Sequence, residues 1–187
     1  VALAARTQGD LREVLADLIP AGTLGVVLAG GSVTAQEAYA VGQTWDDPLV
    51  ITAKWDDEKR VGVWDIPPFI ECAPVAGNVK LYCLEARPLA SLIDIVVAGG
   101  AGDIIIVLPP GWAANVDRVT KGMGSVKSSV PTQPTPGSPL LIVRGAVGMG
   151  TLKVRGANGY DLWVINRDRR KRGLPPITSE GRPQLGR

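Results

Sequence analysis

A short motif in the second half of the chain recurs almost unchanged, and this repetition constrains the fold more than any other feature. Gly122-Met-Gly-Ser-Val-Lys127 returns 26 residues later as Gly148-Met-Gly-Thr-Leu-Lys153. The order glycine, polar residue, aliphatic residue also occurs at Gly102-Asp-Ile104 and Gly77-Asn-Val79. The glycines at 77, 102, 124 and 150 are spaced by 25, 22 and 26 residues. A nearly constant period of this length is typical of a repeat protein.

Each copy also predicts a β-strand with one face toward a core. Aliphatic residues alternate with a residue that is Lys in three of the four copies, which is the pattern of a half-buried strand. The two inward columns are Val79, Ile104, Val126 and Leu152, and then Leu81, Ile106, Ser128 and Val154. Glycine before each strand suits a corner with positive φ. One unit cannot bury its own apolar face, so the four copies are expected to stack into a mainly β solenoid. A β-sandwich with glycine-rich antiparallel turns is the alternative.

Composition supports a β body with a core of small aliphatic residues. Aromatic residues are scarce, with one Phe, three Tyr and five Trp in 187 residues, and 23 glycines and 15 prolines suit many short strands. There is no run of 18 apolar residues, no signal peptide and no initiator Met, so we expect a non-spanning fragment of a longer product. Cys72 and Cys83 are too few for a disulfide framework. Cys83 continues the inward phase of its strand, which favours buried thiols over a Cys72–Cys83 disulfide.

Outside the repeats, residues 1–20 predict an amphipathic helix that Pro20 ends. We expect this helix to cover an open strand edge of the body. Strands are predicted at 23–28, 49–55 and 60–66, with a loop at 29–48, and a last strand at 160–165. The basic run 167–172 follows. Residues 166–187 carry seven Arg or Lys against Asp168 and Glu180, whereas the first 165 residues are slightly acidic in sum.

Two pieces of the chain resemble known families. Residues 2–18 resemble the closing half of the SHOCT-like helical module of bacterial envelope-associated proteins. The glycine series from Gly77-Asn-Val79 to Gly148-Met-Gly-Thr-Leu152, preceded by Trp64-Asp-Ile-Pro67, resembles the C-terminal domain of LiaF, of the cell wall-active antibiotics response family. The resemblance implies a right-handed β-solenoid and a non-enzymatic regulatory role in envelope stress, on the cytoplasmic side and with membrane association. The expected domains are a helical piece at 1–20, a β-solenoid at 21–166 and a basic tail at 167–187.

The residue types present argue against most catalytic chemistry. Histidine is absent, which removes the usual general base and His-dependent nucleophiles and metal sites. The acidic clusters Asp46-Asp47 and Asp56-Asp57-Glu58 could in principle supply paired carboxylates or bind calcium, but adjacent acids on a turn are more often solvated. Gly99 to Gly102 lacks the following helix of a phosphate-binding loop. We therefore predict no catalytic residues, no cofactor and no metal.

The basic run is the one candidate contact site. Its members are Arg167, Arg169, Arg170, Lys171 and Arg172. They are expected to contact an anionic membrane face or an acidic protein partner, with nucleic acid not expected, and a solvated tail is the alternative. Lys127 and Lys153 are expected to form a solvated face.

The overall prediction is an interaction or regulatory module that binds a protein partner or a second copy of itself. The competing hypothesis is a carbohydrate-binding or carboxylate-dependent hydrolase domain that uses Trp45, Trp55 and Trp64 with nearby Asp residues.

Overall fold

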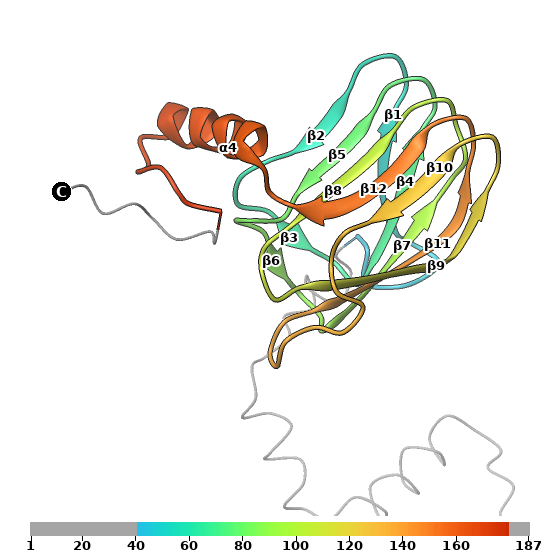
Figure 1. The fold of residues 1–187 in the computed structure, drawn as a ribbon, viewed down its shortest axis with the longest axis horizontal. Coiled ribbons are helices and arrows are strands. Elements are labelled where there is room, and N and C mark those ends of the chain that lie inside the picture. The colour runs from blue at the N-terminus through green and yellow to red at the C-terminus, as the bar shows by residue number, and fades with distance from the viewer. Residues whose placement is uncertain (1–40, 180–187) are drawn as a thin grey trace, which may run out of the picture. The chain divides into compact units, whose positions relative to one another are not determined.

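The computed structural model describes residues 41–179, which form a mainly β body with one helix (Figure 1). The chain divides into two units, Val1–Ala40 and Val41–Arg187, and the described residues belong to the second. The helix expected at 1–20, the strand expected at 23–28 and most of the loop expected at 29–48 lie outside the described residues.

Within residues 41–179 the strands form two five-stranded sheets and one two-stranded pair, and every one of these strand pairs is parallel. The first sheet has the order β1 (Leu49–Ala53), β4 (Phe69–Pro74), β7 (Leu92–Val97), β11 (Leu140–Val147), β9 (Ala113–Lys121). The second has the order β10 (Ser125–Ser128), β12 (Thr151–Gly156), β8 (Ile104–Leu108), β5 (Val79–Tyr82), β2 (Glu58–Arg60). The small pair is β3 (Asp65–Ile66) with β6 (Arg87–Pro88). Parallel pairing rules out the antiparallel sandwich.

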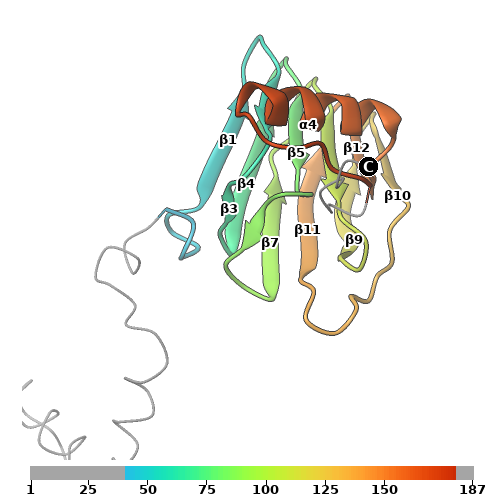
Figure 2. The ribbon, with the colours of Figure 1, turned by 90° about the vertical axis from the view of Figure 1, so that its left-hand side faces the viewer.

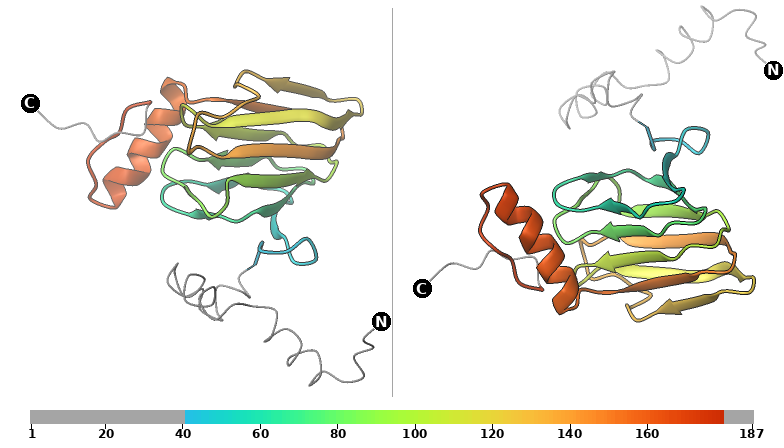
Figure 3. Two further views of the ribbon diagram at one scale, coloured as in Figure 1. Left: turned by 90° about the horizontal axis from the view of Figure 1, so that it is seen from below. Right: turned by 90° about the horizontal axis from the view of Figure 1, so that it is seen from above.

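The chain passes back and forth between the two large sheets, so that consecutive strands build layers (Figures 2 and 3). The layers are β1/β2, β4/β5, β7/β8, β11/β12 and β9/β10, in spatial order. The last layer in the chain therefore lies inside the stack, between β7/β8 and β9/β10. The β9/β10 layer forms one end of the described stack. Ser128, which the pattern places in an inward column, is exposed there. Ser in a column that is otherwise aliphatic suits an edge position.

The predicted inward column is confirmed. Ile104 pairs with Val79 on one side and Leu152 on the other, and Leu152 pairs with Val126. Val79, Ile104 and Leu152 are at most 2 % exposed, and Val126 at the edge is half-buried. The remaining core side chains are mostly Ile, Leu and Val from both sheets. Cys72 and Cys83 are buried free thiols, as the alternation favoured.

The physical reason expected for the corner glycines is wrong. In the described part of the chain the glycines with positive φ are 42, 62, 111, 137, 145 and 173, and none of the four repeat glycines is among them. Instead, the backbone of the neighbouring layer approaches too closely for a side chain. A Cβ on Gly102 would lie 1.9 Å from the carbonyl oxygen of Gly77, and one on Gly150 would lie 2.0 Å from that of Gly102. The repeat therefore encodes the spacing between layers.

The polar residue after each glycine links adjacent layers through hydrogen bonds. The Asp103 amide donates to Asn78 Oδ1 at 2.8 Å, and the Thr151 amide donates to Asp103 Oδ1 at 2.7 Å. At the far end, the Ser125 and Thr151 hydroxyls are 3.2 Å apart. At the near end, the backbone amide of Asn78 donates to Asp57 Oδ1 at 3.2 Å. The contacts of the Asp103, Thr151 and Asn78 backbone amides satisfy donors at corners that the strands leave unpaired.

Two predicted elements need correction. The strand expected at 160–165 is wrong, because Gly159–Lys171 is a helix, α4. Asn158 caps it, and the buried Asp161, Ile165 and Arg169 recur every fourth residue, which is a helical period. The boundary expected after residue 166 therefore falls inside this helix. The strand expected at 60–66 is split into β2 and β3 by Gly62, whose φ is +82°.

Candidate interaction face on helix α4

Helix α4 lies across the outer side of the second sheet, where strands β5, β8 and β12 end (Figures 1 and 2). Tyr82 and Val107 are paired outward residues of β5 and β8. They form a second apolar cluster with Leu84, Ile165 of the helix and Ile177 beyond it. Ile165 and Ile177 are 1 % and 2 % exposed. The helix is therefore packed on the body along its middle.

An ion pair between a half-buried arginine and a buried aspartate fixes the beginning of the helix. Arg155, at the end of β12, forms two hydrogen bonds to the carboxylate of Asp161, which is 1 % exposed. The same carboxylate accepts the Asn158 amide at 2.8 Å, and the Asn158 side chain accepts the Asp161 amide at 3.0 Å. The hydrogen bond to Asp161 raises the pKa of Arg155. The negative charge of Asp161 also interacts favourably with the positive end of the helix dipole, because it lies in the first turn.

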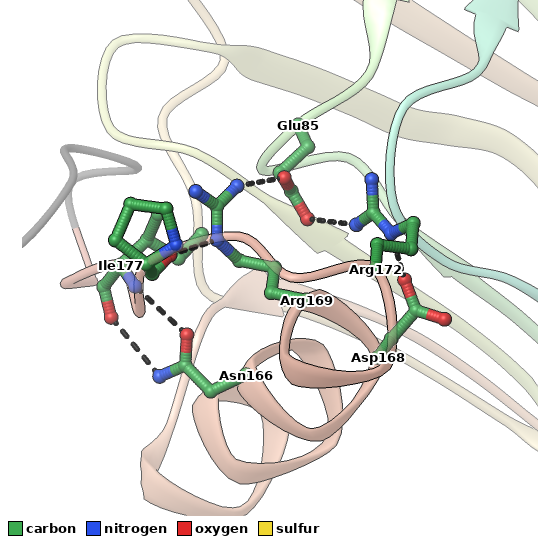
Figure 4. Close-up of polar contacts among 7 residues, drawn as sticks. Glu85, Asn166, Asp168, Arg169, Arg172 and Ile177 are labelled. Carbon is green, nitrogen blue, oxygen red and sulfur yellow. Dashed lines mark hydrogen bonds and ion pairs between the residues drawn. The ribbon is translucent and has the colours of Figure 1, made fainter.

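A second ion-pair cluster fixes the end of the helix (Figure 4). Glu85, in the segment between β5 and β6, accepts hydrogen bonds from Arg169 and from Arg172, the latter at 3.2 Å. Arg172 Nε also donates to Asp168 at 2.8 Å. The Glu85 and Arg169 side chains are 7 % and 10 % exposed, so this pair is largely removed from water.

The chain after the helix is held by Asn166. The Asn166 side chain donates to the carbonyl oxygen of Ile177 at 3.1 Å, and it accepts the Ile177 amide at 2.8 Å (Figure 4). These two bonds place Ile177 in the apolar cluster beneath the helix. Residues 167–172 are therefore part of an ordered, docked element.

The structure divides the five basic candidate residues into two groups. Arg169 and Arg172 point toward the body and bind Glu85. Arg167, Arg170 and Lys171 are exposed on the other side. Only the second group can reach a partner without breaking the contacts that hold the helix.

Two aromatic residues that the sequence reasoning missed lie beside this exposed group. Tyr160 and Trp163 are 64 % and 56 % exposed, and their ring centroids are 5.9 Å apart in a stacked arrangement. The Arg167 guanidinium lies 5.4 Å from the Trp163 ring centroid. We define the outer face of helix α4 as Tyr160, Trp163, Arg167, Arg170 and Lys171. At 100° per residue these five span about 100° of the helix circumference. Placing residues 160–171 on a helix brings these five side chains to one face, whereas a strand at 160–165 does not predict this grouping.

One residue of the acidic clusters, Asp57, is held in an ion pair with a neighbouring strand. Asp57 accepts hydrogen bonds from Lys80 at 2.6 Å and from the Asn78 side chain at 2.8 Å. The hydrogen bond from Lys80 is the main cause that lowers the pKa of Asp57 to about 2. A carboxylate held ionised in this way is a poor proton donor. Among residues 41–179, no group of three or more His, Cys, Asp or Glu side chains is placed to hold a metal ion.

The three tryptophans of the competing hypothesis have different environments. Trp64 is half-buried against the core, and its indole nitrogen donates to the Tyr82 carbonyl oxygen at 3.1 Å. Trp45 packs on Phe69 with ring centroids 4.6 Å apart, and it lies under the guanidinium of Arg144 at 3.9 Å. Trp55 is 88 % exposed.

A pocket of about 260 Å³ lies near the start of β9, but none of these tryptophans lines it. Its lining is mostly apolar and glycine- or proline-rich, and it contains no charged side chain. The lining includes Leu108, Trp112 and Val130. The polar side chains in this lining are those of Ser129 and Ser179 and the indole of Trp112.

The lysines predicted on the outward face of the repeats, Lys80, Lys127 and Lys153, are in register, and Lys59 of β2 continues their row. Lys59, Lys80, Ile105, Lys153 and Lys127 form one row across the second sheet. Lys59 and Lys80 both lie near Asp57. Lys127 is exposed, whereas Lys153 is half-buried.

The fold and the site together define a mainly β protein of parallel layers that carries a docked helix with an exposed aromatic and basic face. No known family model, no curated protein and no solved structure matches the chain. Within residues 41–179, no helix has the length and apolarity needed to cross a membrane.

Proposed function

We propose that this chain is a non-enzymatic interaction and regulatory module of the bacterial cell-envelope stress response, and that helix α4 is its contact element. The β body serves as a rigid platform, and the outer face of helix α4 is the surface offered to a partner. The resemblance of the glycine repeats to the LiaF C-terminal domain supports the envelope-stress assignment.

We also propose that the body is a right-handed β-solenoid. The parallel pairing of all strands and the alternation of consecutive strands between two sheets support this proposal. The close backbone approach at the repeat glycines further supports it. In such a fold, each layer stabilises its neighbours, so a helix fixed to three layers is held in one orientation.

The single observation that carries the functional proposal is the two-sided character of helix α4. Its inner side is committed to the body through Asp161, Ile165 and Arg169, which are at most 8 % exposed. Its outer side leaves two large aromatic rings and three cations in solvent. Exposed aromatic and arginine side chains that cluster on one face are typical of binding surfaces.

The proposal is tested by replacing the outer face in the native cell. We expect Trp163→Ala combined with Arg167→Gln to change the induction of envelope-stress genes by a cell wall-active antibiotic, at unchanged protein level. The control is Asp46→Asn combined with Asp47→Asn, which removes the acidic pair that a carboxylate-dependent hydrolase would need. If only the acidic pair matters, the interaction proposal is wrong and the hydrolase alternative gains support.

A further inference from the structure

We infer that the outer face of helix α4 binds the surface of an anionic lipid bilayer. This inference rests on the proposed function of the helix as a contact element, and it names the partner.

The first argument is charge. Arg167, Arg170 and Lys171 lie on one side of the helix, and the nearby acids Asp161 and Asp168 are engaged with Arg155 and Arg172. The face is therefore purely cationic. Each cation close to an anionic bilayer strengthens binding by roughly fivefold, so three together contribute about a hundredfold. Such attraction weakens as salt increases.

The second argument is the pair of aromatic rings. Tyr160 and Trp163 are large amphipathic side chains, which are favoured at the lipid–water interface. Their exposure leaves apolar ring surface in water that a bilayer interface would cover. Arginine stacked on an indole, as Arg167 is on Trp163, can enter the headgroup layer together with the ring.

The third argument is shape. In Figures 1 and 3 the helix lies along one side of the described body, and the described segment that follows it runs along the same side. The five residues lie on a convex cylinder and are not among those that line the described pocket. A convex face matches a plane, whereas a peptide or a small ligand would need a groove. The chemistry matches that of interfacial helices, in which basic and aromatic residues meet the headgroups.

The test is co-sedimentation of the full chain with phosphatidylcholine vesicles, with and without phosphatidylserine. We expect binding only to the vesicles that contain phosphatidylserine, together with a loss of binding at high salt. Arg167→Gln, Arg170→Gln and Lys171→Gln combined should weaken binding about a hundredfold. The matched control is Lys59→Gln, Lys127→Gln and Lys153→Gln combined, which removes the same charge from the second sheet and should retain most of the binding.

A second pair of variants keeps the test valid if neutralisation loosens the helix. Trp163→Ala leaves every ion pair of the helix intact and should weaken binding severalfold, whereas Trp55→Ala, at an exposed tryptophan elsewhere, should not. Three results would overturn the lipid inference. They are equal binding to both kinds of vesicle, an equal loss of binding in the triple variant of the helix and the triple variant of the second sheet, and no binding at all. If vesicles do not bind but the Trp163 and Arg167 variant still alters the stress response in cells, the partner is an acidic protein, and the proposed function stands.

Discussion

Replacing Gly102 by Ala tests why the repeat contains glycine. A Cβ at this position would lie 1.9 Å from the Gly77 carbonyl oxygen, whereas ordinary contact begins at 3.4 Å, so the two layers would have to separate by about 1.5 Å. Three hydrogen bonds at this corner would be stretched: Gly102 to Pro74, Asp103 to Asn78, and Val79 to Asp103. At about 1 kcal/mol for each bond, plus about 1 kcal/mol or more for repacking, we expect a loss of about 4 kcal/mol in the free energy of unfolding.

Urea unfolding followed by tryptophan fluorescence and circular dichroism measures this loss, and the same corner supplies a control. A Cβ on Gly99 would meet its nearest atom at 3.5 Å, so Gly99→Ala should stay within about 1 kcal/mol of the wild type. A second control separates space from conformation. Gly137 has a φ of +82° and no atom near its Cβ position, so Gly137→Ala should cost about 1–2 kcal/mol of strain. If Gly102→Ala is as stable as Gly99→Ala, the close-approach explanation is refuted.

Three further predictions concern the ionisable groups. Because the folded-state pKa of Asp57 is about 2, below its ordinary 3.8, its ionised form stabilises the fold above pH 4, and this stability is lost as the pH falls toward 2. Lys80→Gln should lose that pH dependence in acid unfolding curves, and an unchanged curve would contradict it. Burial raises the pKa of the Cys72 thiol to about 12 and raises that of Cys83 as well, so neither should react with Ellman's reagent in the folded protein, and both should react in denaturant. Glu85→Gln leaves the buried Arg169 without its charged partner, at a cost of about 3 kcal/mol, and should speed amide hydrogen exchange in the second half of helix α4 only. Uniform acceleration along the helix would mean that Asp161 and Glu85 do not anchor the two ends separately.

The repeat period predicts the fold of the body well because it reflects contacts between consecutive layers. The column through Val79, Ile104 and Leu152 follows directly from alternation and from the position of the glycine. The repeat pattern does not include the first layer, because Asp56 stands where the later layers have glycine. Asp56 can carry a side chain there because no layer lies beyond β1/β2 in the described part of the chain.

The order of the last two layers and the helix could not be predicted from local pattern alone. The corner motifs Gly122–Lys127 and Gly148–Lys153 are nearly identical, so they do not decide which copy lies next to β8. The copy that does, β12, carries the buried Val154 where β10 carries the exposed Ser128. For residues 160–165, apolar and aromatic content favours a strand locally. The helix forms there because Asn158 caps it, because Arg155 pairs with Asp161 in its first turn, and because Glu85, which lies far away in the sequence, pairs with the cations of its last turn.

The sequence predicts the cations of the candidate site, but it predicts neither which of them are exposed nor the aromatic residues beside them. Composition alone identified the cations at 167–172. It could not separate Arg169, which Glu85 holds, from Arg167, which remains exposed, because their partners come from different parts of the chain. Tyr160 and Trp163 become part of the site only when the segment is helical.

The most direct test of helix α4 as the lipid-contacting surface is the depth of a spin label in vesicle-bound protein. Tyr160→Cys places the label on the outer face and keeps Trp163 and the three cations, while Met123→Cys, at a residue 83 % exposed in the β9–β10 corner, is the control. The native thiols of Cys72 and Cys83 are buried and should not take the label. With anionic vesicles, we predict that the label at 160 becomes accessible to lipid-soluble oxygen and protected from a water-soluble nickel chelate, while the label at 123 stays in water. A label at 123 that enters the lipid, or a label at 160 that stays in water while the protein is bound, would contradict the assignment.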